Sequence, residues 1–283
     1  MGRDMSRIVL LGSTGFVGKH LCRELARRGH SLQVLARNPE KTPQGVEAVR
    51  ADLLSADLER HFEGADAVIN LVGVLHAPFD ELHVKLPERI AQACEKAQVH
   101  RLLHMSALGA SPEGPSEYLK SKFSGEQAIG AFSRCHTIFR PSIILGEGDH
   151  FVPLFSGLMK LTPILPVACP DSKLQPVMVS DVARAFADSL EMESACGKTF
   201  CLCGPEIHSL IGLARKIADS KGMKRILLPL PDSISRIQAR ILELTPGPLM
   251  TFDNYLSLQK DNVCEEPFPE EFNWKPAAIT LPS

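Results

Sequence analysis

The stretch Ile8-Val-Leu-Leu-Gly12-Ser-Thr-Gly15-Phe-Val-Gly18 decides the fold class of this chain. An apolar run of strand length leads directly into three glycines spaced three residues apart, and a helical pattern follows over residues 17–28. Gly12 permits a tight turn, Gly15 lets the backbone approach a bound pyrophosphate, and Gly18 lets the helix pack closely on the strand. The start of that helix then offers unpaired N–H groups to an anion. The pattern therefore predicts a dinucleotide-binding turn.

Strand and helix signals alternate through the first half of the chain. Apolar runs predict strands at 8–11, 32–35, 46–51, 67–72, 101–105 and 137–139, and amphipathic patterns predict helices at 17–28, 54–61, 86–98 and 118–132. Strands separated by helices of this length predict an α/β fold, a doubly wound parallel Rossmann sheet over residues 1–150.

The alternation of strand and helix patterns ends at about Gly146, where prolines become frequent. Helical patterns return at 180–192 and 209–221. We expect residues 151–283 to form a smaller, mixed C-terminal substrate lobe over the carboxyl edge of the sheet, with segments that return to the Rossmann sheet.

Composition narrows the classes of function. The 283 residues are 44% hydrophobic and carry a net charge of -2 without a dense Lys/Arg run, so no nucleic-acid partner is expected. No apolar run is long enough for a secretory signal or a membrane span, which favours a cytoplasmic protein, with peripheral attachment at the inner face of a membrane as an alternative. The eight cysteines and ten histidines lack metal-ligand spacing, so we expect no metal site and read the cysteines as reduced, buried thiols.

The end of the second predicted strand bears on the choice of cofactor. NAD enzymes usually place an acidic residue there for the ribose 2′-hydroxyl, whereas this chain has Leu35-Ala-Arg37-Asn38. A guanidinium at Arg37 suits a 2′-phosphate, so NADP(H) is favoured over the alternative NAD(H). The full set of predicted cofactor-binding residues is Gly12, Ser13, Thr14, Gly15, Phe16, Val17, Gly18, Arg37, Asp52, Leu53, Leu71, Val72, Gly73, Met105, Lys122, Pro141 and Ser142.

Tyr118-Leu-Lys-Ser-Lys122 supplies the predicted catalytic pair. Residues four apart share one face of a helix, so the phenol and the ammonium point into one space, and the ammonium is expected to lower the pKa of Tyr118. Ser106, at the end of the fifth predicted strand, would face the same cleft and hold a substrate oxygen. These three residues predict proton transfer at a carbonyl that receives a hydride. The alternative is that Tyr-x-x-x-Lys lies on a surface helix without catalysis.

The glycine turn, Ser106, Tyr118-x-x-x-Lys122 and Arg140-Pro-Ser142 resemble the extended short-chain dehydrogenase/reductase superfamily. Longer stretches resemble an atypical branch, the family of the NADPH-binding accessory subunit of respiratory complex I and its bacterial relatives; they are 106–110, 118–126, 140–149, 177–183, 251–253 and 261–263. The resemblance implies that Lys122 contacts the nicotinamide ribose, that Tyr118 donates a proton with help from Ser106, and that Pro141 and Ser142 line the nicotinamide side.

Three functions remain open from the sequence. The first is NADPH-dependent hydride transfer to a carbonyl or to a lipophilic, quinone-like substrate, and the second is a non-catalytic NADPH-binding structural, assembly or redox-sensing protein beside membrane-bound respiratory complex I. A sugar-nucleotide epimerase or dehydratase is the third, and it ranks lower because the lobe has no evident basic pocket for a second diphosphate. An amphipathic helix over Ile234 to Leu244 is expected to pack on the body of the protein, with membrane contact as the alternative.

Overall fold

A parallel seven-stranded sheet forms the centre of the molecule. The computed structural model describes residues 6–43, 45–245 and 249–281. The strands follow the order β11-β6-β5-β4-β1-β2-β3. Their bounds are β1 Arg7–Leu11, β2 Ser31–Ala36, β3 Glu47–Arg50, β4 Ala67–Asn70, β5 Arg101–Met105, β6 Cys135–Pro141 and β11 Lys198–Leu202. The predicted doubly wound Rossmann sheet is confirmed, and its strand order reverses between β1 and β4, the place where such sheets bind their ligands.

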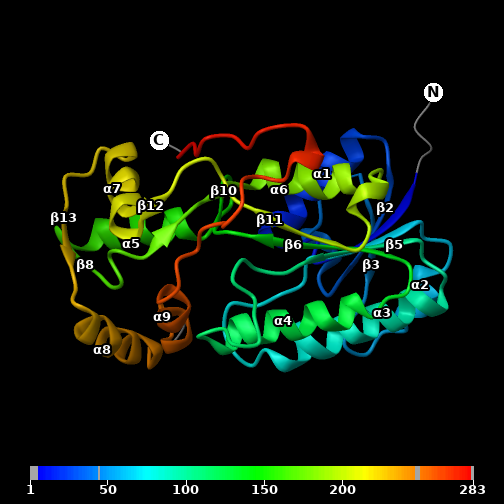
Figure 1. The fold of residues 1–283 in the computed structure, drawn as a ribbon, viewed down its shortest axis with the longest axis horizontal. Coiled ribbons are helices and arrows are strands. Elements are labelled where there is room, and N and C mark those ends of the chain that lie inside the picture. The colour runs from blue at the N-terminus through cyan, green and yellow to red at the C-terminus, as the bar shows by residue number, and fades with distance from the viewer. Residues whose placement is uncertain (1–5, 44, 246–248, 282–283) are drawn as a thin grey trace.

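Helices cover both faces of the sheet. Figure 1 shows α1 (Phe16–Arg27) and α6 (Val179–Ser189) on one face, and α2 (Leu58–Phe62), α3 (Leu86–Lys96) and α4 (Glu117–Gly130) on the other. The strands are apolar on both sides, as a doubly covered sheet requires, and two buried clusters result. Leu21 and Phe186 belong to the first cluster, and Phe62 and Ile90 to the second.

Most of the remaining helices and strands form the lobe at the left of Figure 1, whereas β7 (Ile144–Leu145) and β10 (Val177–Met178) pair with each other beside α6. The bounds of the others are α5 Phe151–Leu161, β8 Ile164–Val167, β9 Lys173–Leu174, β12 His208–Ser209, α7 Leu210–Ser220, β13 Ile226–Pro229, α8 Asp232–Glu243 and α9 Phe252–Leu258. A third apolar cluster, which includes Leu165 and Leu213, holds this lobe together. Helix α6 and strand β11 come from beyond residue 150 and belong to the layers of the sheet; the division into a Rossmann domain and a substrate lobe at residue 150 stays a prediction.

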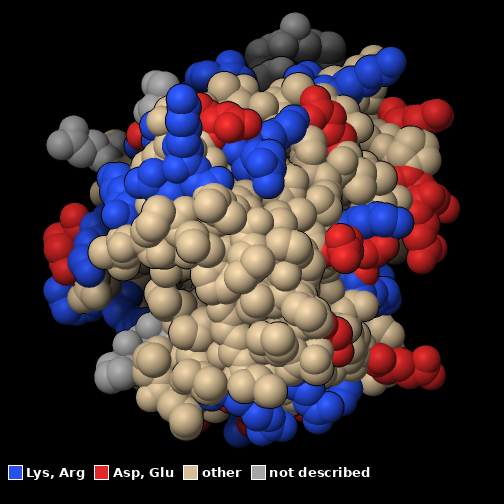
Figure 2. All heavy atoms as spheres, turned by 90° about the vertical axis from the view of Figure 1, so that its left-hand side faces the viewer, with Lys and Arg blue, Asp and Glu red and all other residues tan. Residues whose placement is uncertain are grey.

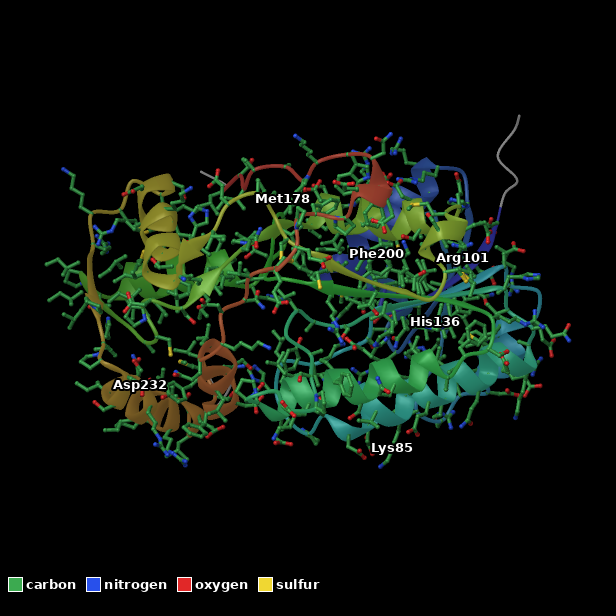
Figure 3. All side chains as sticks on the ribbon, viewed as in Figure 1. Lys85, Arg101, His136, Met178, Phe200 and Asp232 are labelled. Carbon is green, nitrogen blue, oxygen red and sulfur yellow. A yellow bond between two sulfur atoms is a disulfide. The ribbon has the colours of Figure 1, made fainter. Side chains whose placement is uncertain are left out.

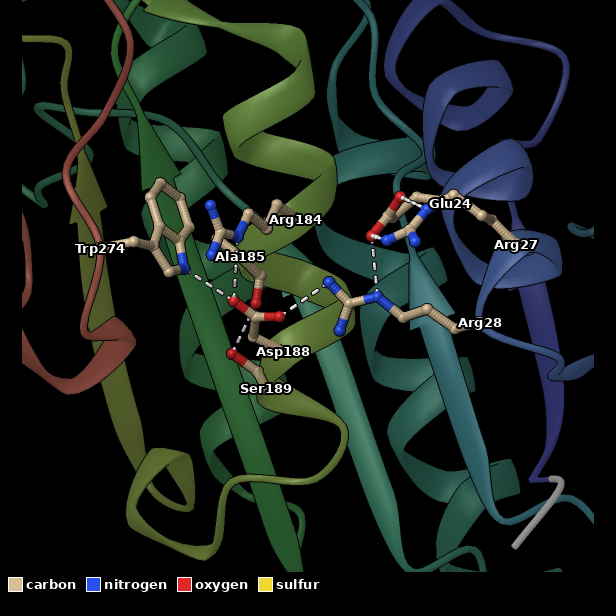
Figure 4. A network of polar contacts seen from close by, with 8 residues as sticks. All are labelled: Glu24, Arg27, Arg28, Arg184, Ala185, Asp188, Ser189 and Trp274. Atoms are coloured by element: carbon tan, nitrogen blue, oxygen red, sulfur yellow. Dashed lines mark hydrogen bonds and ion pairs between the residues drawn. The ribbon is translucent and has the colours of Figure 1, made fainter. Parts of the chain in front are cut away.

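A polar network ties α1, α6 and the C-terminal segment together (Figure 4). The carboxylate of Asp188, near the end of α6, pairs with Arg28 at 2.7 Å and accepts a 2.7 Å hydrogen bond from the indole Nε1 of Trp274. Arg101 makes a comparable link from the start of β5, donating to the carbonyl of Met192 at 2.8 Å (Figure 3). These contacts position the helices on the sheet and lie away from its carboxyl edge.

The cysteines depart from the expectation of reduced thiols. Cys135 is joined to Cys196, and Cys203 to Cys264. The first pair forms because β6 and β11 are parallel neighbours, with Thr137 opposite Lys198, so Cys135 at the start of β6 meets Cys196, two residues before β11. The expectation was therefore wrong for these four cysteines, and spacing in the sequence could not have revealed a pairing that depends on strand order.

Helix α8 also differs from its predicted packing. Ser235 and Ala239 are buried against the body of the lobe, whereas Ile234, Ile237 and Ile241 are exposed. The prediction that the apolar face packs inward is wrong, because the small residues on the opposite face allow the closer approach. None of the helices in the described part of the chain has the length and apolar character needed to cross a bilayer.

Candidate functional site

The glycine-rich turn joins the end of β1 to the start of α1. Gly12 has a φ of 88°, and a Cβ built on it would lie 3.0 Å from the backbone carbon of Leu71 at the end of β4. A Cβ on Gly18 would lie 2.2 Å from the carbonyl oxygen of Gly12, so that position accepts only glycine without rearrangement. The turn therefore lies directly over the β1/β4 switch, with Leu71, Val72 and Gly73 beside it.

The start of α1 is built to receive an anion. Gly15 is the N-cap, it offers no side-chain hydrogen bond, and the first turn contains no acidic residue. Within the described chain, the buried hydroxyl of Ser13 has no hydrogen-bond partner. Unpaired N–H groups, a positive helix end and an orphaned hydroxyl fit the diphosphate of a dinucleotide. Thr14, Phe16 and Val17 belong to the same turn, and their contacts with a cofactor stay predictions.

Arg37 and Asp52 follow neighbouring strands at this edge. Arg37 is exposed directly after β2, and its guanidinium has no hydrogen bond or ion pair with the residues that the structure describes. Asp52 accepts a 3.2 Å hydrogen bond from the backbone N–H of Leu54, as a turn-forming aspartate does, and Leu53 is half-buried between them. Arg37 is thus available for a phosphate, whereas Asp52 already serves the turn.

Lys122 is buried at the carboxyl end of β5. Its ammonium donates a 2.7 Å hydrogen bond to the carbonyl of Met105, and burial lowers its pKa to about 8 against the opposing effect of Glu126. A Cβ built on Gly73 would lie 3.7 Å from the Lys122 Nζ, so the residues after β4 and β5 meet here. The adjacent hydroxyl of Ser106 is buried and has no hydrogen-bond partner among the described residues. Two orphaned serine hydroxyls and a desolvated ammonium therefore lie along one sheet edge.

Tyr118 lies in the first turn of α4, and its pKa differs from the expected direction. Burial raises the pKa of the phenol to about 12, and no effect of Lys122 offsets this. The expectation of a lowered pKa is wrong, because the cost of removing the phenolate from water is the effect that sets the pKa of Tyr118. Tyr118 is consequently protonated at neutral pH, the form that a proton donor requires.

His83 is a site residue that the sequence did not single out. It lies in a π-helical turn, Asp80–Lys85, and its Nε2 accepts a 2.9 Å hydrogen bond from the N–H of Val74. Its Nδ1 lies 2.9 Å from the hydroxyl of Ser121, and its ring packs edge-on against Tyr118 at 5.7 Å. Burial and the Lys122 charge lower the pKa of His83 to about 3, so the ring is neutral with its proton on Nδ1. Nothing in the spacing of the sequence marked this residue.

Asp253 on α9 is the second residue that the sequence did not assign to the site. Its carboxylate accepts hydrogen bonds from the backbone N–H groups of Glu117 at 2.7 Å and Tyr118 at 3.1 Å. It thus caps α4 together with Ser116, whose hydroxyl accepts from Leu119. The position of Tyr118 therefore depends on a helix of the C-terminal lobe.

The residues after β6 are held by the same C-terminal segment. The hydroxyl of Ser142 donates a 2.6 Å hydrogen bond to Asn262 Oδ1, which also accepts from the N–H of Ile143 at 3.0 Å. Pro141 is buried, and its carbonyl accepts a 2.9 Å hydrogen bond from the backbone N–H of Leu108. Contacts of Pro141 and Ser142 with a nicotinamide stay predictions. No group of three or more potential metal ligands occurs in the described part of the chain.

Comparison with known proteins shows which class of nucleotide-binding fold contains this site. Residues 12–151 match a family model described as NAD(P)H-binding. The chain is also similar to a solved nucleoside-diphosphate-sugar epimerase from Staphylococcus aureus, with a TM-score of 0.77, 18% identity, and coverage of 96% of this chain and 97% of that one. At that identity the likeness shows the fold. The chain therefore carries an NAD(P)-binding domain of the Rossmann type.

Its relatives in sequence narrow the class further. The chain is 27% identical over 293 residues to NADH dehydrogenase (ubiquinone) 1 alpha subcomplex subunit 9, mitochondrial, of Rattus norvegicus, covering 97% of this chain and 78% of the rat protein. It is 32% identical over 184 residues to a ceramide reductase of Caulobacter vibrioides, covering 62% of this chain and 58% of that protein. These homologues are consistent with an extended short-chain dehydrogenase/reductase-like family, as the sequence motifs predicted.

Proposed function

We propose that this chain is an NADP(H)-dependent reductase that acts on the carbonyl of a lipophilic substrate. The observation that carries the proposal is the meeting, along one sheet edge, of an anion-receiving turn with buried Ser106 and Lys122 and half-buried Tyr118. The name of the ceramide reductase relative supports a lipid-like carbonyl compound as the substrate class. The exposed Arg37 supports NADP(H) over NAD(H).

The residues divide the reaction between them. When bound, NADPH would supply the hydride to the carbonyl carbon and leave as NADP⁺. Tyr118, protonated because its pKa is about 12, would donate its proton to the carbonyl oxygen, and the hydroxyl of Ser106 would hold that oxygen. Lys122, fixed by the Met105 carbonyl, would bind the ribose and favour the transient phenolate, and the product is an alcohol.

Titration of nicotinamide fluorescence with NADPH and NADH tests the cofactor. We expect NADPH to bind about tenfold tighter or more, and Arg37→Ala to remove that preference, because it loses a charge-assisted phosphate contact. Arg60→Ala, an exposed arginine on α2, is the control and should retain it. Equal affinities in the wild type would overturn the NADP(H) assignment.

NADPH consumption with long-chain ketones and quinones tests turnover. We expect Tyr118→Phe to lower it by roughly 10²–10⁴-fold through loss of the proton donor. Tyr255→Phe is the matched control. The hydroxyl of Tyr255, on α9, donates a 2.8 Å hydrogen bond to Asp232, on α8. Tight NADPH binding without consumption of any acceptor would instead support the second candidate.

The second candidate is a structural, assembly or redox-sensing protein that keeps NADPH bound beside respiratory complex I. The match to a complex I subunit over 97% of this chain favours it. An enzyme must exchange its cofactor in each turnover, so retention of NADPH through dialysis would support the structural function. Either function suits a cytoplasmic protein that associates peripherally with the inner face of a membrane. Sugar-nucleotide epimerisation ranks below both, because the epimerase likeness concerns the fold.

A further inference from the structure

The outer side of the C-terminal lobe exposes apolar side chains on two adjoining elements. On α8, Ile234, Ile237 and Ile241 are 47%, 58% and 60% exposed, and their spacing puts them on one side of the helix. Strand β13 leads into α8 through Leu230 and Pro231, and its parallel pairing with β8 presents a second apolar surface. We call the following residues the outer apolar face: Ile164, Ile226, Leu228, Ile234, Ile237, Ile241 and Leu244.

Basic side chains border this face. Residues 221–245 contain five Lys or Arg and two Asp or Glu, although the chain as a whole has a net charge of -2. The two acids are already engaged by α9: Asp232 accepts from the Tyr255 hydroxyl at 2.8 Å, and Glu243 accepts from the Phe252 N–H at 3.2 Å. Figure 2 shows the side of the molecule that carries this face, with an uncharged centre, Lys or Arg along its upper left and lower margins, and Asp or Glu along its right margin.

We propose that the outer apolar face docks on the surface of a bilayer that contains anionic phospholipid. An isoleucine stripe can enter the boundary between headgroups and acyl chains, while Arg236 and Arg240, whose guanidinium groups lie 5.9 Å and 4.2 Å from the centre of the Phe252 ring, stay exposed beside it and contact the phosphates. The excess of Lys and Arg in residues 221–245 favours this occupant over a second copy of the chain, because a two-fold contact would bring two such basic segments together. Large apolar surfaces with a polar rim are typical of such docking sites.

The docked face is linked to the candidate site by two helices. Asp232 and Glu243 bind α8 to α9, and Asp253 of α9 caps the turn of α4 that holds Tyr118. Figure 3 labels Asp232 at the start of α8, on the same side of the molecule as α9. Delivery of a lipophilic substrate from the bilayer to Tyr118 rests on the proposed function, whereas docking does not require nucleotide or turnover.

Vesicle flotation of the full chain tests the proposal directly. We expect the protein to float with vesicles of phosphatidylcholine and phosphatidylglycerol, to float much less with phosphatidylcholine alone, and to dissociate as salt is raised. Ile237→Asp with Ile241→Asp should abolish flotation, because two charges would have to enter the acyl boundary. The control Gln92→Asp with Gln127→Asp adds the same charge at exposed positions on α3 and α4 and should still float.

A second pair of variants separates the charge from the apolar contact. Arg236→Gln with Arg240→Gln should weaken binding to anionic vesicles by about tenfold or more and leave binding to phosphatidylcholine alone unchanged. Unchanged NADPH binding and thermal unfolding in every variant would show that the fold is intact. Failure of the wild type to float would overturn the proposal. So would a dimer in solution that the isoleucine variants dissociate while vesicle binding persists.

Discussion

At the carboxyl edge of the sheet, Ser106 and Lys122 are buried polar groups, whereas on the outer face of α8 Ile237 and Ile241 are exposed apolar ones. Both regions depart from the usual distribution of side chains, in opposite directions. Burying a polar group without a partner costs stability, and a contiguous exposed apolar surface is uncommon on a folded protein, so both are informative exceptions. The first exception suits a polar ligand brought into the protein, and the second suits an apolar surface outside it.

The comparison predicts that truncating one aliphatic side chain of the lobe changes the free energy of unfolding strongly, whereas truncating another changes it very little. Leu213 on α7 is fully buried, and we expect Leu213→Ala to lower the free energy of unfolding by about 3 kcal/mol. Ile237→Ala should change it by less than about 0.5 kcal/mol, because its side chain is already in water. Urea unfolding of both variants measures the difference. A large loss for Ile237→Ala would show that the outer apolar face is covered in solution.

The glycine turn offers the next largest effect. We expect Gly18→Ala to weaken NADPH binding by about 100-fold, since a Cβ there would lie 2.2 Å from the Gly12 carbonyl and displace the turn. Gly157→Ala in α5 is the matched control, because its Cβ would meet nothing within 4 Å. The control should bind normally and gain up to about 1 kcal/mol of stability from helix propensity. Normal NADPH binding by Gly18→Ala would contradict the assigned turn.

The sheet and the turn could be predicted because local sequence determines them. Apolar runs of strand length, helical spacing and glycines at fixed offsets all lie within short windows, so six strands of the sheet and Gly12, Gly15 and Gly18 followed from the residues alone, whereas β11, which joins the sheet from beyond residue 150, was not among the predicted strands. Tyr118 and Lys122 were placed on one helix by their spacing, and Ser106 was placed after a strand. Their assembly at one edge needs only the rule that parallel strands end together.

The rest depended on contacts between distant segments. Asp253 caps α4 from 136 residues further along the chain than Glu117, and the two disulfides follow from strand order and the path of the C-terminal segment. The pKa of Tyr118 is set by burial, which no spacing reveals. For α8, the periodicity identified an amphipathic helix but gave no sign of which face turns inward. Ser235 and Ala239 decided that question by allowing close packing.

Lys122 provides a pH test of the buried edge. Its pKa is about 8 in the folded chain, against 10.5 as the ordinary lysine value. Below pH 8 both states are protonated and the cost of burying the ammonium is fully present. As the pH rises from 8 towards 10.5, only the unfolded chain keeps the proton, so the free energy of unfolding should rise by roughly 1.4 kcal/mol per pH unit.

Lys122→Met should remove that increment. Denaturant unfolding of both proteins at pH 7.5, 8.5 and 9.5 measures it as the difference between their pH slopes, in which the other titrating groups cancel. Parallel slopes would mean that Lys122 is solvated in the folded chain. The carboxyl edge of the sheet would then hold no desolvated ammonium to compare with the outer apolar face.

Asp253 tests the link between the two regions with the smallest change in stability. We expect Asp253→Ala to cost about 1 kcal/mol, as loss of a helix cap does, and to lower turnover because the first turn of α4 carries Tyr118. Asp57→Ala is the matched control: Asp57 caps α2 by accepting from Arg60, so it should cost similar stability without affecting turnover. Asp253→Asn, which keeps an acceptor oxygen, should restore most of the activity. If both alanine variants lowered turnover equally, the effect would follow global stability, and α9 would have no specific role in positioning Tyr118.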